Sequence, residues 1–382
     1  MKILQVIHFF SRPHGAGSVQ SAWDLSYEWI KMGHEVSIYT TDFELDQEYI
    51  DSLPDAKIHT FPNWTNSASF TMAPGMMRRL NKEIRYFDIV HIHNYRAFHE
   101  SMVHHYATKY GVPYVLQARG SIPRIMGKEF LKKIYDNLIG FRVLRDASKL
   151  IAHNQLEATQ YRSVGVNPAK IEVVPVGIDL QPFEHLPERG EFRRKYSIQP
   201  EEKIVLFLAR LHKIKSPDLL VNSFARLTET IDNARLVFVG ADDGCLDATR
   251  QLAKELNITD RVLFTGPLYN RDKIEAYTDA DVYVLPSLYD MLPRTVLEAC
   301  ACGTPVIITE HCGLADWVHQ QVGYTVPHDE DKLKEALFTI LTDENLSRQF
   351  SENAKKLVRD FAGDVIADRI INIYEDVIKS TK

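Results

Sequence analysis

The sequence predicts an α/β protein with two doubly wound domains, each built on a parallel sheet. Short apolar runs typical of buried strands alternate with helical segments along almost the whole chain, the order that parallel sheets with crossover helices produce. The 382 residues exceed what one hydrophobic core usually serves. The alternation restarts after residues 173–187, where three prolines and the lack of a clear period indicate a connector.

The first domain is expected to span residues 1–178. Its predicted strands are "KILQVIHFF" (2–10), "HEVSIYTT" (34–41), "DIVHIH" (88–93), "PYVLQAR" (113–119), "SKLIAHN" (148–154) and "KIEVVPVG" (170–177). Between the first two strands, "HGAGS" (14–18) is predicted to form a glycine loop, and residues 18–32 a helix closed by Gly33. A long helical stretch is expected over residues 124–147.

The second domain is expected to span residues 179–364 and repeats this order. Its predicted strands are "KIVLFLAR" (203–210), "ARLVFVG" (234–240), "RVLFTG" (261–266), "DVYVLPS" (281–287) and "PVIIT" (305–309). Helices are predicted over residues 216–229 and 293–303, and residues 332–382 are polar, periodic and helical. The last helix, about 365–382, is expected to return to the first domain. Because open α/β sheets bind ligands at the carboxyl ends of their strands, a substrate is expected in a central cleft that the two domains face.

Composition and charge limit the classes of function that the protein can have. Hydrophobic residues make up 45% and charged residues 25%, a balance typical of a soluble globular protein, and the net charge of −6 argues against a nucleic-acid binder. Residues 1–180 carry 20 basic and 18 acidic residues, against 25 and 33 in the remainder, so a contact with a polyanion or a membrane is expected in the first half. No secretory signal or membrane-spanning run is evident, which favours a cytoplasmic protein.

Two pairs of residues are candidates for chemistry at strand ends. Arg210 follows a strand, Lys215 comes five residues later, and Ser216-Pro217 opens a helix, a combination that suits a phosphate group. The alternative is a solvated loop with two surface charges. Asp290 and Glu298 lie on either side of the helix start at Pro293, within reach of one ligand. The alternatives are a helix cap for Asp290 and a partly buried helix acid for Glu298.

A metal site is not expected. The histidines at positions 91, 93, 99, 104 and 105 show no zinc-ligand spacing, and His91 and His93 are expected to point to opposite faces of a strand. Asp242 and Asp243 lie in a glycine-bounded loop, which favours a turn.

A basic segment follows "ARGSIPR" in the first half. Arg119 and Arg124 could hold a phosphate or carboxylate of an acceptor, and residues 124–149 carry seven basic residues interleaved with apolar ones. A basic amphipathic helix of this kind can lie on an anionic membrane. The alternative is an ordinary core helix with a solvated basic face.

Two series of motifs resemble, in order and spacing, those of the GT-B glycosyltransferases of family 4. The second half contains "ARLHKIK", "VFVG", "DRVLFTGPL", "ADVYVLPS", Asp-x7-Glu and "LEACACGTPVI". The first half contains "GAGS", "MGHEV", "FDIVHIHN" and "VVPVGID". The resemblance implies two Rossmann-like domains, with the acceptor bound by the first and the donor by the second. It also implies a retaining enzyme that takes sugar from a nucleotide diphosphate sugar of the UDP or GDP type, with no cofactor and no metal.

The resemblance assigns a role to each matching residue. Arg210 and Lys215 match the pair that holds the donor diphosphate. Asp290 matches the acid that contacts the transferred sugar, Glu298 the acid that binds the ribose, and His93 a histidine near the sugar. The remaining matches are donor contacts, namely Gly17 near the phosphates, Leu268 at the base, and Met291 and Leu292 beside Asp290. The chain departs from the family where Asp290 replaces Glu, Met291 replaces Gly and Val176 replaces Asn.

The predicted function is therefore glycosyl transfer to a glycan, a lipid-linked acceptor or a small molecule, in the synthesis of a cell-surface polysaccharide or glycolipid. Peripheral contact with the inner face of a membrane through residues 124–149 is part of this prediction. Two alternatives stay open, a sugar-nucleotide epimerase with the GT-B fold and a non-catalytic subunit.

Overall fold

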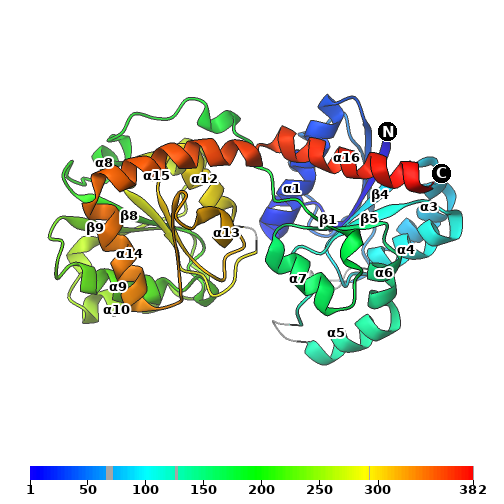
Figure 1. The fold of residues 1–382 in the computed structure, drawn as a ribbon. Coiled ribbons are helices and arrows are strands. Elements are labelled where there is room, and N and C mark those ends of the chain that lie inside the picture. The colour runs from blue at the N-terminus through cyan, green and yellow to red at the C-terminus, as the bar shows by residue number, and fades with distance from the viewer. Residues whose placement is uncertain (66–71, 125–127, 292, 382) are drawn as a thin grey trace. The chain divides into compact units, whose positions relative to one another are not determined.

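The computed structural model describes residues 1–65, 72–124, 128–291 and 293–381, with only the backbone described for residues 12–16. The chain divides into two compact units (Figure 1). Unit 1 consists of Met1–Gly177 and Gly363–Lys382, and unit 2 consists of Ile178–Ala362. The division after Gly177 lies one residue before the expected boundary, and the C-terminal segment belongs to unit 1.

Unit 1 is built on a parallel sheet. Among the described residues this sheet has seven strands in the order β3-β2-β1-β4-β5-β6-β7. The strands are β1 (Lys2–Phe9), β2 (Glu35–Thr41), β3 (Lys57–Phe61), β4 (Ile89–His93), β5 (Tyr114–Gln117), β6 (Lys149–Ala152) and β7 (Ile171–Val173). The chain order runs outward from β1 on one side and from β4 on the other, so the topological switch point lies between these two strands.

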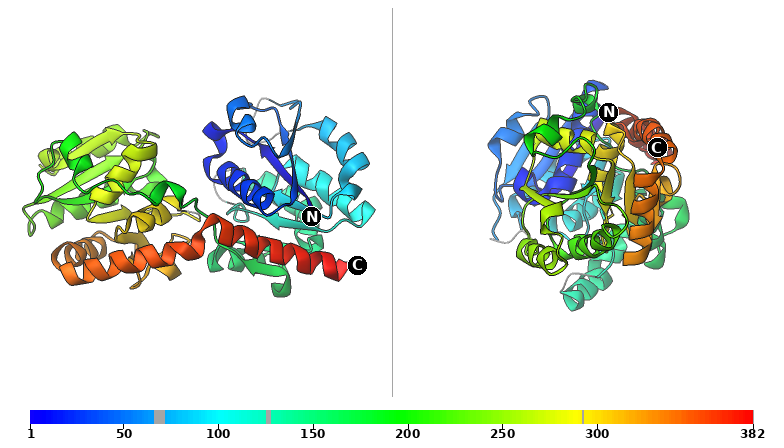
Figure 2. Two further views of the ribbon diagram at one scale, coloured as in Figure 1. Left: turned by 90° about the horizontal axis from the view of Figure 1, so that it is seen from above. Right: turned by 90° about the vertical axis from the view of Figure 1, so that its left-hand side faces the viewer.

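Helices lie on both faces of the unit 1 sheet (Figure 2). One buried cluster joins α1, α2 and α16 to the sheet, and a second joins α3, α4, α6 and α7 to it. The helices are α1 (Arg12–Lys31), α2 (Gln47–Asp51), α3 (Pro74–Glu83), α4 (Phe98–Tyr110), α5 (Glu129–Tyr135), α6 (Phe141–Asp146), α7 (Gln155–Ser163) and α16 (Gly363–Thr381), and a π-helix (Asp136–Gly140) joins α5 to α6.

Two details of unit 1 differ from the sequence prediction. The predicted glycine loop at 14–18 is wrong, because α1 already begins at Arg12 with a proline in its first turn, where the fixed φ of proline suits a helix. The edge strand β3 was not predicted, since only its last residue is buried and its sequence "KIHTF" lacks an apolar run. The predicted helix end at Gly33 is confirmed, with a φ of 84° that glycine adopts without strain.

Unit 2 repeats this architecture. Its sheet, within the described residues, has six parallel strands in the order β10-β9-β8-β11-β12-β13, and the switch point lies between β8 and β11. The strands are β8 (Lys203–Leu208), β9 (Ala234–Val239), β10 (Val262–Gly266), β11 (Val282–Leu285), β12 (Val306–Thr309) and β13 (Gly323–Val326). The helices are α8 (Glu191–Lys195), α9 (Pro217–Leu227), α10 (Leu246–Glu255), α11 (Asn270–Asp279), α12 (Arg294–Cys302), α13 (Ala315–Val318), α14 (Glu330–Thr342) and α15 (Glu344–Leu357).

A buried carboxyl group joins two helices of unit 1. Glu100, in the first turn of α4, accepts hydrogen bonds through Oε1 from the backbone N–H of Ala97 (2.8 Å) and from the hydroxyl of Tyr135 (2.5 Å). Burial raises the pKa of Glu100 to about 8, although these hydrogen bonds act in the opposite direction. The side chain therefore stays protonated in the folded protein at neutral pH.

This shift predicts that unit 1 loses stability as the pH rises. The pKa of Glu100 is near 4.5 in the unfolded chain and about 8 in the folded one, so between these values unfolding releases a proton. The free energy of unfolding should fall over this range by at most about 1.4 kcal/mol per pH unit. Glu100→Gln keeps the acceptor oxygen but cannot ionise, so denaturant melts at pH 5.5 and 8.5 should show a flatter pH dependence. An unchanged slope would contradict this account. Glu129→Gln, which alters an exposed acid on α5, is the control.

Candidate active site

The loops after β8 and β11 meet at the carboxyl edge of the unit 2 sheet. These strands are neighbours at the switch point, and the backbone N–H of Leu288 donates to the carbonyl of Ile214 at 2.8 Å. Residues 209–216 and 286–291 therefore occupy one place in the fold, where open α/β sheets bind their ligands.

Lys215 and Asp290 form an ion pair across these loops. Lys215 Nζ lies 2.5 Å from Asp290 Oδ2, and both side chains are 16% exposed. Lys215 ends a 3₁₀ turn, Lys213–Lys215, and the next residue, Ser216, has a φ of 48° and a hydroxyl 2.9 Å from Nε2 of His328. The carbonyl of Asp290 accepts from the N–H of Gly313 at 2.7 Å. The pair is thus fixed from both sides, next to the first turn of α9.

Arg210 faces a different acid. Its guanidinium pairs with Asp243, in the loop after β9, and the arginine side chain is largely exposed. Asp242 accepts from the backbone N–H groups at 244, 245 and 246, which confirms the turn predicted for this acid pair. Gly240 allows the close approach of this loop, because a Cβ there would lie 1.9 Å from the carbonyl oxygen of Ala209.

Glu298 is held by α11. Its Oε1 lies 2.8 Å from Nζ of Lys273, and its Oε2 accepts a hydrogen bond from the hydroxyl of Tyr277 at 3.1 Å. Burial and the nearby charge of Glu298 raise the pKa of Tyr277, so the phenol remains a donor. The structure gives Asp290 and Glu298 separate cationic partners. Sequence reasoning missed Lys273 and Tyr277, although their spacing of four residues places them on one helix face.

The other predicted donor contacts occupy varied positions. Leu268 is partly buried against the core of unit 2, and Met291 is buried. Leu292 lies outside the described residues. Gly17 lies exposed within α1, not in a loop, and a Cβ there would meet no atom within 4 Å.

His93 lies at the switch point of unit 1, at the carboxyl end of β4. It is fully buried, with Nε2 2.5 Å from Gln5 Oε1 and Nδ1 2.9 Å from Arg119 Nη2. Because a guanidinium only donates, Nδ1 must accept and Nε2 must carry the proton. Burial, with added repulsion from His91 and Arg119, lowers the pKa of His93 well below its usual range. The ring is therefore neutral, with one fixed tautomer.

Gln5 fixes this network from β1. Its Nε2 donates to the carbonyl of Ala22 at 3.2 Å, which turns Oε1 toward His93. Sequence reasoning missed Gln5, although a polar residue inside the apolar run "KILQVIHFF" is the signal that could have identified it.

The prediction that His91 and His93 face opposite ways is wrong. Their rings stack with centroids 4.3 Å apart, because residues two apart on a strand share a face.

The two predicted acceptor arginines belong to different clusters. Besides His93, Nη2 of Arg119 donates to Gln117 Oε1 at 3.0 Å. Arg124 Nε donates to Asp136 Oδ2 at 2.9 Å, and Arg96 binds the same carboxylate. Burial alone would raise the pKa of Asp136, but hydrogen bonds from the two arginines outweigh it and lower the pKa.

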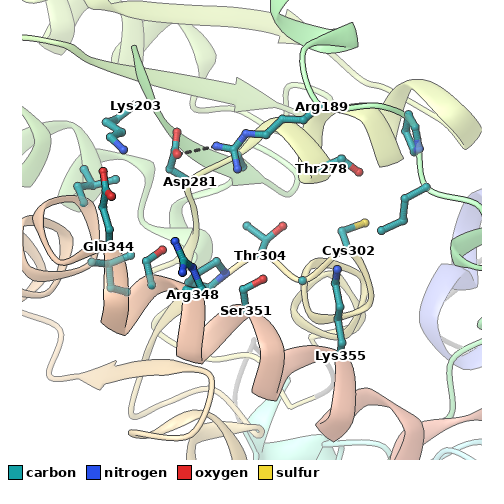
Figure 3. Close-up of a pocket in the computed structure, with 18 residues that line it drawn as sticks. Arg189, Lys203, Thr278, Asp281, Cys302, Thr304, Glu344, Arg348, Ser351 and Lys355 are labelled. Carbon is teal, nitrogen blue, oxygen red and sulfur yellow. Dashed lines mark hydrogen bonds and ion pairs between the residues drawn. The ribbon is translucent and has the colours of Figure 1, made fainter. Parts of the chain in front are cut away.

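A pocket of about 570 Å³ opens at the other edge of the unit 2 sheet (Figure 3). Its lining includes Lys203 at the start of β8 and Pro305 just before β12, so it lies at the amino ends of the strands. The Arg189–Asp281 ion pair (2.6 Å) crosses its rim. This pocket is therefore separate from the loops that carry Lys215 and Asp290.

Two other classes of site are absent from the part of the chain that the structure describes. In residues 1–65, 72–124, 128–291 and 293–381, no three His, Cys, Asp or Glu side chains group as metal ligands would. Within the same ranges, no helix has the length and apolar character needed to cross a bilayer.

Each half of the chain matches the model of a known protein family. Residues 15–182 match the model of the family described as "Glycosyltransferase Family 4", and residues 188–357 match "Glycosyl transferases group 1". The D-inositol 3-phosphate glycosyltransferase of Mycobacteroides abscessus is 31% identical over 240 residues, 61% of this chain and 53% of that protein, so the match spans about half of the relative's length. An uncharacterised glycosyltransferase of Methanocaldococcus jannaschii is 26% identical over 91% of this chain and 90% of its own.

Solved structures share the fold. The crystal structure of Anabaena HepE in complex with UDP has a TM-score of 0.80 and 18% identity, and the match covers 98% of this chain and 100% of that one. Together with two parallel sheets of Rossmann-like order, this likeness identifies the GT-B fold. With family models matching both halves, the chain belongs to the GT-B glycosyltransferases of group 1 and family 4.

Proposed function

We propose that this protein transfers a sugar from a nucleotide diphosphate sugar to an acceptor hydroxyl, with retention and without a metal ion. The observation that carries the proposal is the Lys215–Asp290 ion pair at the switch point of unit 2. It sets a cation for a diphosphate beside an acid for a sugar, at the edge where such sheets bind ligands. The solved HepE structures contain UDP or UDP-glucose, which makes UDP-sugars the first donors to test.

In this proposal each charged group has one task. Lys215 and Arg210 hold the diphosphate and stabilise the charge that grows on it as the bond to the sugar breaks. Asp290 accepts hydrogen bonds from the sugar, and Glu298, already oriented by Lys273 and Tyr277, accepts them from the ribose. The acceptor oxygen then bonds to the sugar on the face that the diphosphate leaves. Its proton passes to the departing phosphate oxygen.

His93 takes a supporting part. With a neutral ring and both nitrogens engaged by Gln5 and Arg119, it is poorly suited to exchange protons. We assign it the positioning of Arg119, which lies two residues after the end of β5 and has a backbone φ of 54°. Arg119 would then be the acceptor-side cation of unit 1.

One experiment separates this function from its two alternatives. A transferase releases UDP only when an acceptor is added, an epimerase releases it without one, and a non-catalytic subunit does not release it.

A thermal-shift screen of nucleoside diphosphates comes first, to identify the nucleotide that the protein binds. A ligand at 100 times its Kd adds about 2.7 kcal/mol to the free energy of unfolding. Release of UDP without any acceptor would overturn the proposal in favour of the epimerase.

The first of three predictions for this function concerns the diphosphate cations. Lys215→Ala should lower turnover about 100-fold or more, because the lost charge acts mainly in the transition state. Arg210→Ala should also lower turnover. Lys213→Ala removes an exposed lysine from the same 3₁₀ turn and should leave the rate unchanged. Normal steady-state rates in both Lys215→Ala and Arg210→Ala would refute the assignment.

The second prediction concerns the ribose. Glu298→Gln should weaken the binding of UDP by about tenfold or more, since a hydrogen bond to a charged acceptor is lost. The same change should hardly affect the 2′,3′-dideoxy analogue, which lacks the hydroxyl groups. Calorimetric titration of both ligands decides the matter. Equal losses for the two ligands would show that Glu298 only supports α11.

The third prediction concerns metal. Lys215, Arg210 and the first turns of α9 and α12 supply positive potential where a divalent cation would otherwise be needed. Transfer should therefore survive excess EDTA. If chelation abolishes transfer and Mg²⁺ or Mn²⁺ restores it, the diphosphate site is misassigned. Asp242 and Asp243 would then be the first residues to mutate.

A further inference from the structure

The pocket at the amino ends of the unit 2 strands is lined by more positive than negative charge. Its volume of about 570 Å³ lies within the range that proteins use for small ligands. The charged side chains of the lining are Arg189, Lys203, Arg348, Lys355, Asp281 and Glu344. Serine and threonine side chains supply most of the remaining polar groups. A ligand that fits this lining is anionic and carries hydroxyl groups.

One of the two acids is already neutralised. Asp281 Oδ1 pairs with Arg189 at 2.6 Å, and its Oδ2 is held by a second arginine and by a backbone N–H group. By contrast, no ion pair within the described part of the chain involves Lys203, Arg348 or Lys355. One acid, in the exposed first turn of α15, is thus set against three cations that no carboxylate pairs with. This surplus of positive charge favours an anion in the pocket.

The cations of the pocket are spread along it. Arg348 and Lys355 lie seven residues apart on α15, so they share one side of the helix with their Cα atoms about 10 Å apart along its axis. Figure 3 shows both side chains on the pocket side of α15, with Ser351 between them. In the same view, Lys203 lies toward the end of the pocket where Arg348 lies. One phosphate group can meet one end of this arrangement, and a second phosphate would meet the other.

The lysine at the other end is positioned by a glycine. A Cβ at Gly303 would lie 2.4 Å from Cε of Lys355 and 3.3 Å from its Nζ. Gly303 follows the last residue of α12 and has a φ of 76°, which glycine adopts without strain. The same residue therefore ends the helix and lets the lysine lie across that end. The stem of Lys355 is fixed by this close contact, and its ammonium group is left for a ligand.

We propose that this pocket binds a small sugar-like molecule that carries a phosphate group at each end. Lys203 and Arg348 contact one phosphate, Lys355 contacts the other, and hydroxyl groups such as that of Ser351 contact the sugar between them. A nucleoside diphosphate fits less well, since its two phosphates are adjacent and none of the described lining residues is an aromatic that could stack on a base. The loops assigned to sugar transfer lie at the opposite edge of the sheet, so the inference does not depend on that function.

The test is calorimetric titration of the full-length protein with fructose 1,6-bisphosphate. Fructose 6-phosphate and inorganic phosphate serve as ligands with one phosphate group, and both should bind about tenfold or more weakly, because each loses one charge-assisted contact. Arg348→Gln and Lys355→Gln should each weaken binding of the bisphosphate about tenfold for the same reason. Lys356→Gln alters the next lysine on α15, which is exposed and outside the pocket lining, and should bind as the wild type does.

Other outcomes would overturn the proposal. Absence of binding, or equal binding by the wild type and both pocket variants, removes the ligand from this pocket. Equal affinity for the bisphosphate and fructose 6-phosphate refutes a ligand with two phosphate ends. Loss of bisphosphate binding in saturating UDP would assign it to the loops of Arg210 and Lys215 instead. The thermal shift with UDP should be the same in the wild type and both pocket variants, which separates failure of this proposal from failure of the proposed transfer.

Discussion

The ion pair between Lys215 and Asp290 is the interaction on which the unit 2 part of the candidate site depends. It joins the two loops that leave the centre of the second sheet in opposite directions. Each partner is mostly removed from water, and removal of one would leave a charge that the surrounding protein cannot solvate, a far larger cost than the net gain from the pair. Gly240 on one side, and the hydrogen bond from Gly313 on the other, keep these loops in register.

The unit 1 sheet also has a switch point, where two strands diverge and polar groups gather at the carboxyl edge. Its switch point holds a chain of neutral and cationic groups that runs from Gln5 through His93 to Arg119. Every link has one feasible donor and one acceptor, so the arrangement of protons is fixed. Such a network gives the side chain of Arg119 a defined position at the carboxyl edge of the unit 1 sheet.

Much of this organisation could be predicted from the sequence, because parallel strands buried on both faces appear as continuous apolar runs. The positions of Lys215, Asp290 and Glu298 in the fold could also be predicted, because these residues lie at strand ends and helix starts that the sequence marks clearly. The partners of these residues could not be predicted. Tyr277 and Lys273 lie on another helix, and only tertiary packing brings them to Glu298. The prediction of a glycine loop at residues 14–18 was wrong because glycine permits a helix as well as a turn. The prediction for His91 was wrong because residues two apart on a strand share a face.

The division of unit 1 into two chain segments bears on the order in which the protein is assembled. Unit 2 is contiguous, so it is complete on the ribosome before α16 has been translated. Unit 1 at that stage lacks the residues of α16 that cover Trp29 and His91, among them Tyr374, whose ring lies 5.4 Å from that of Trp29. The N-terminal sheet is thus synthesised first and closed last, and nascent chains released early would expose the part of its apolar face that α16 covers beside α1.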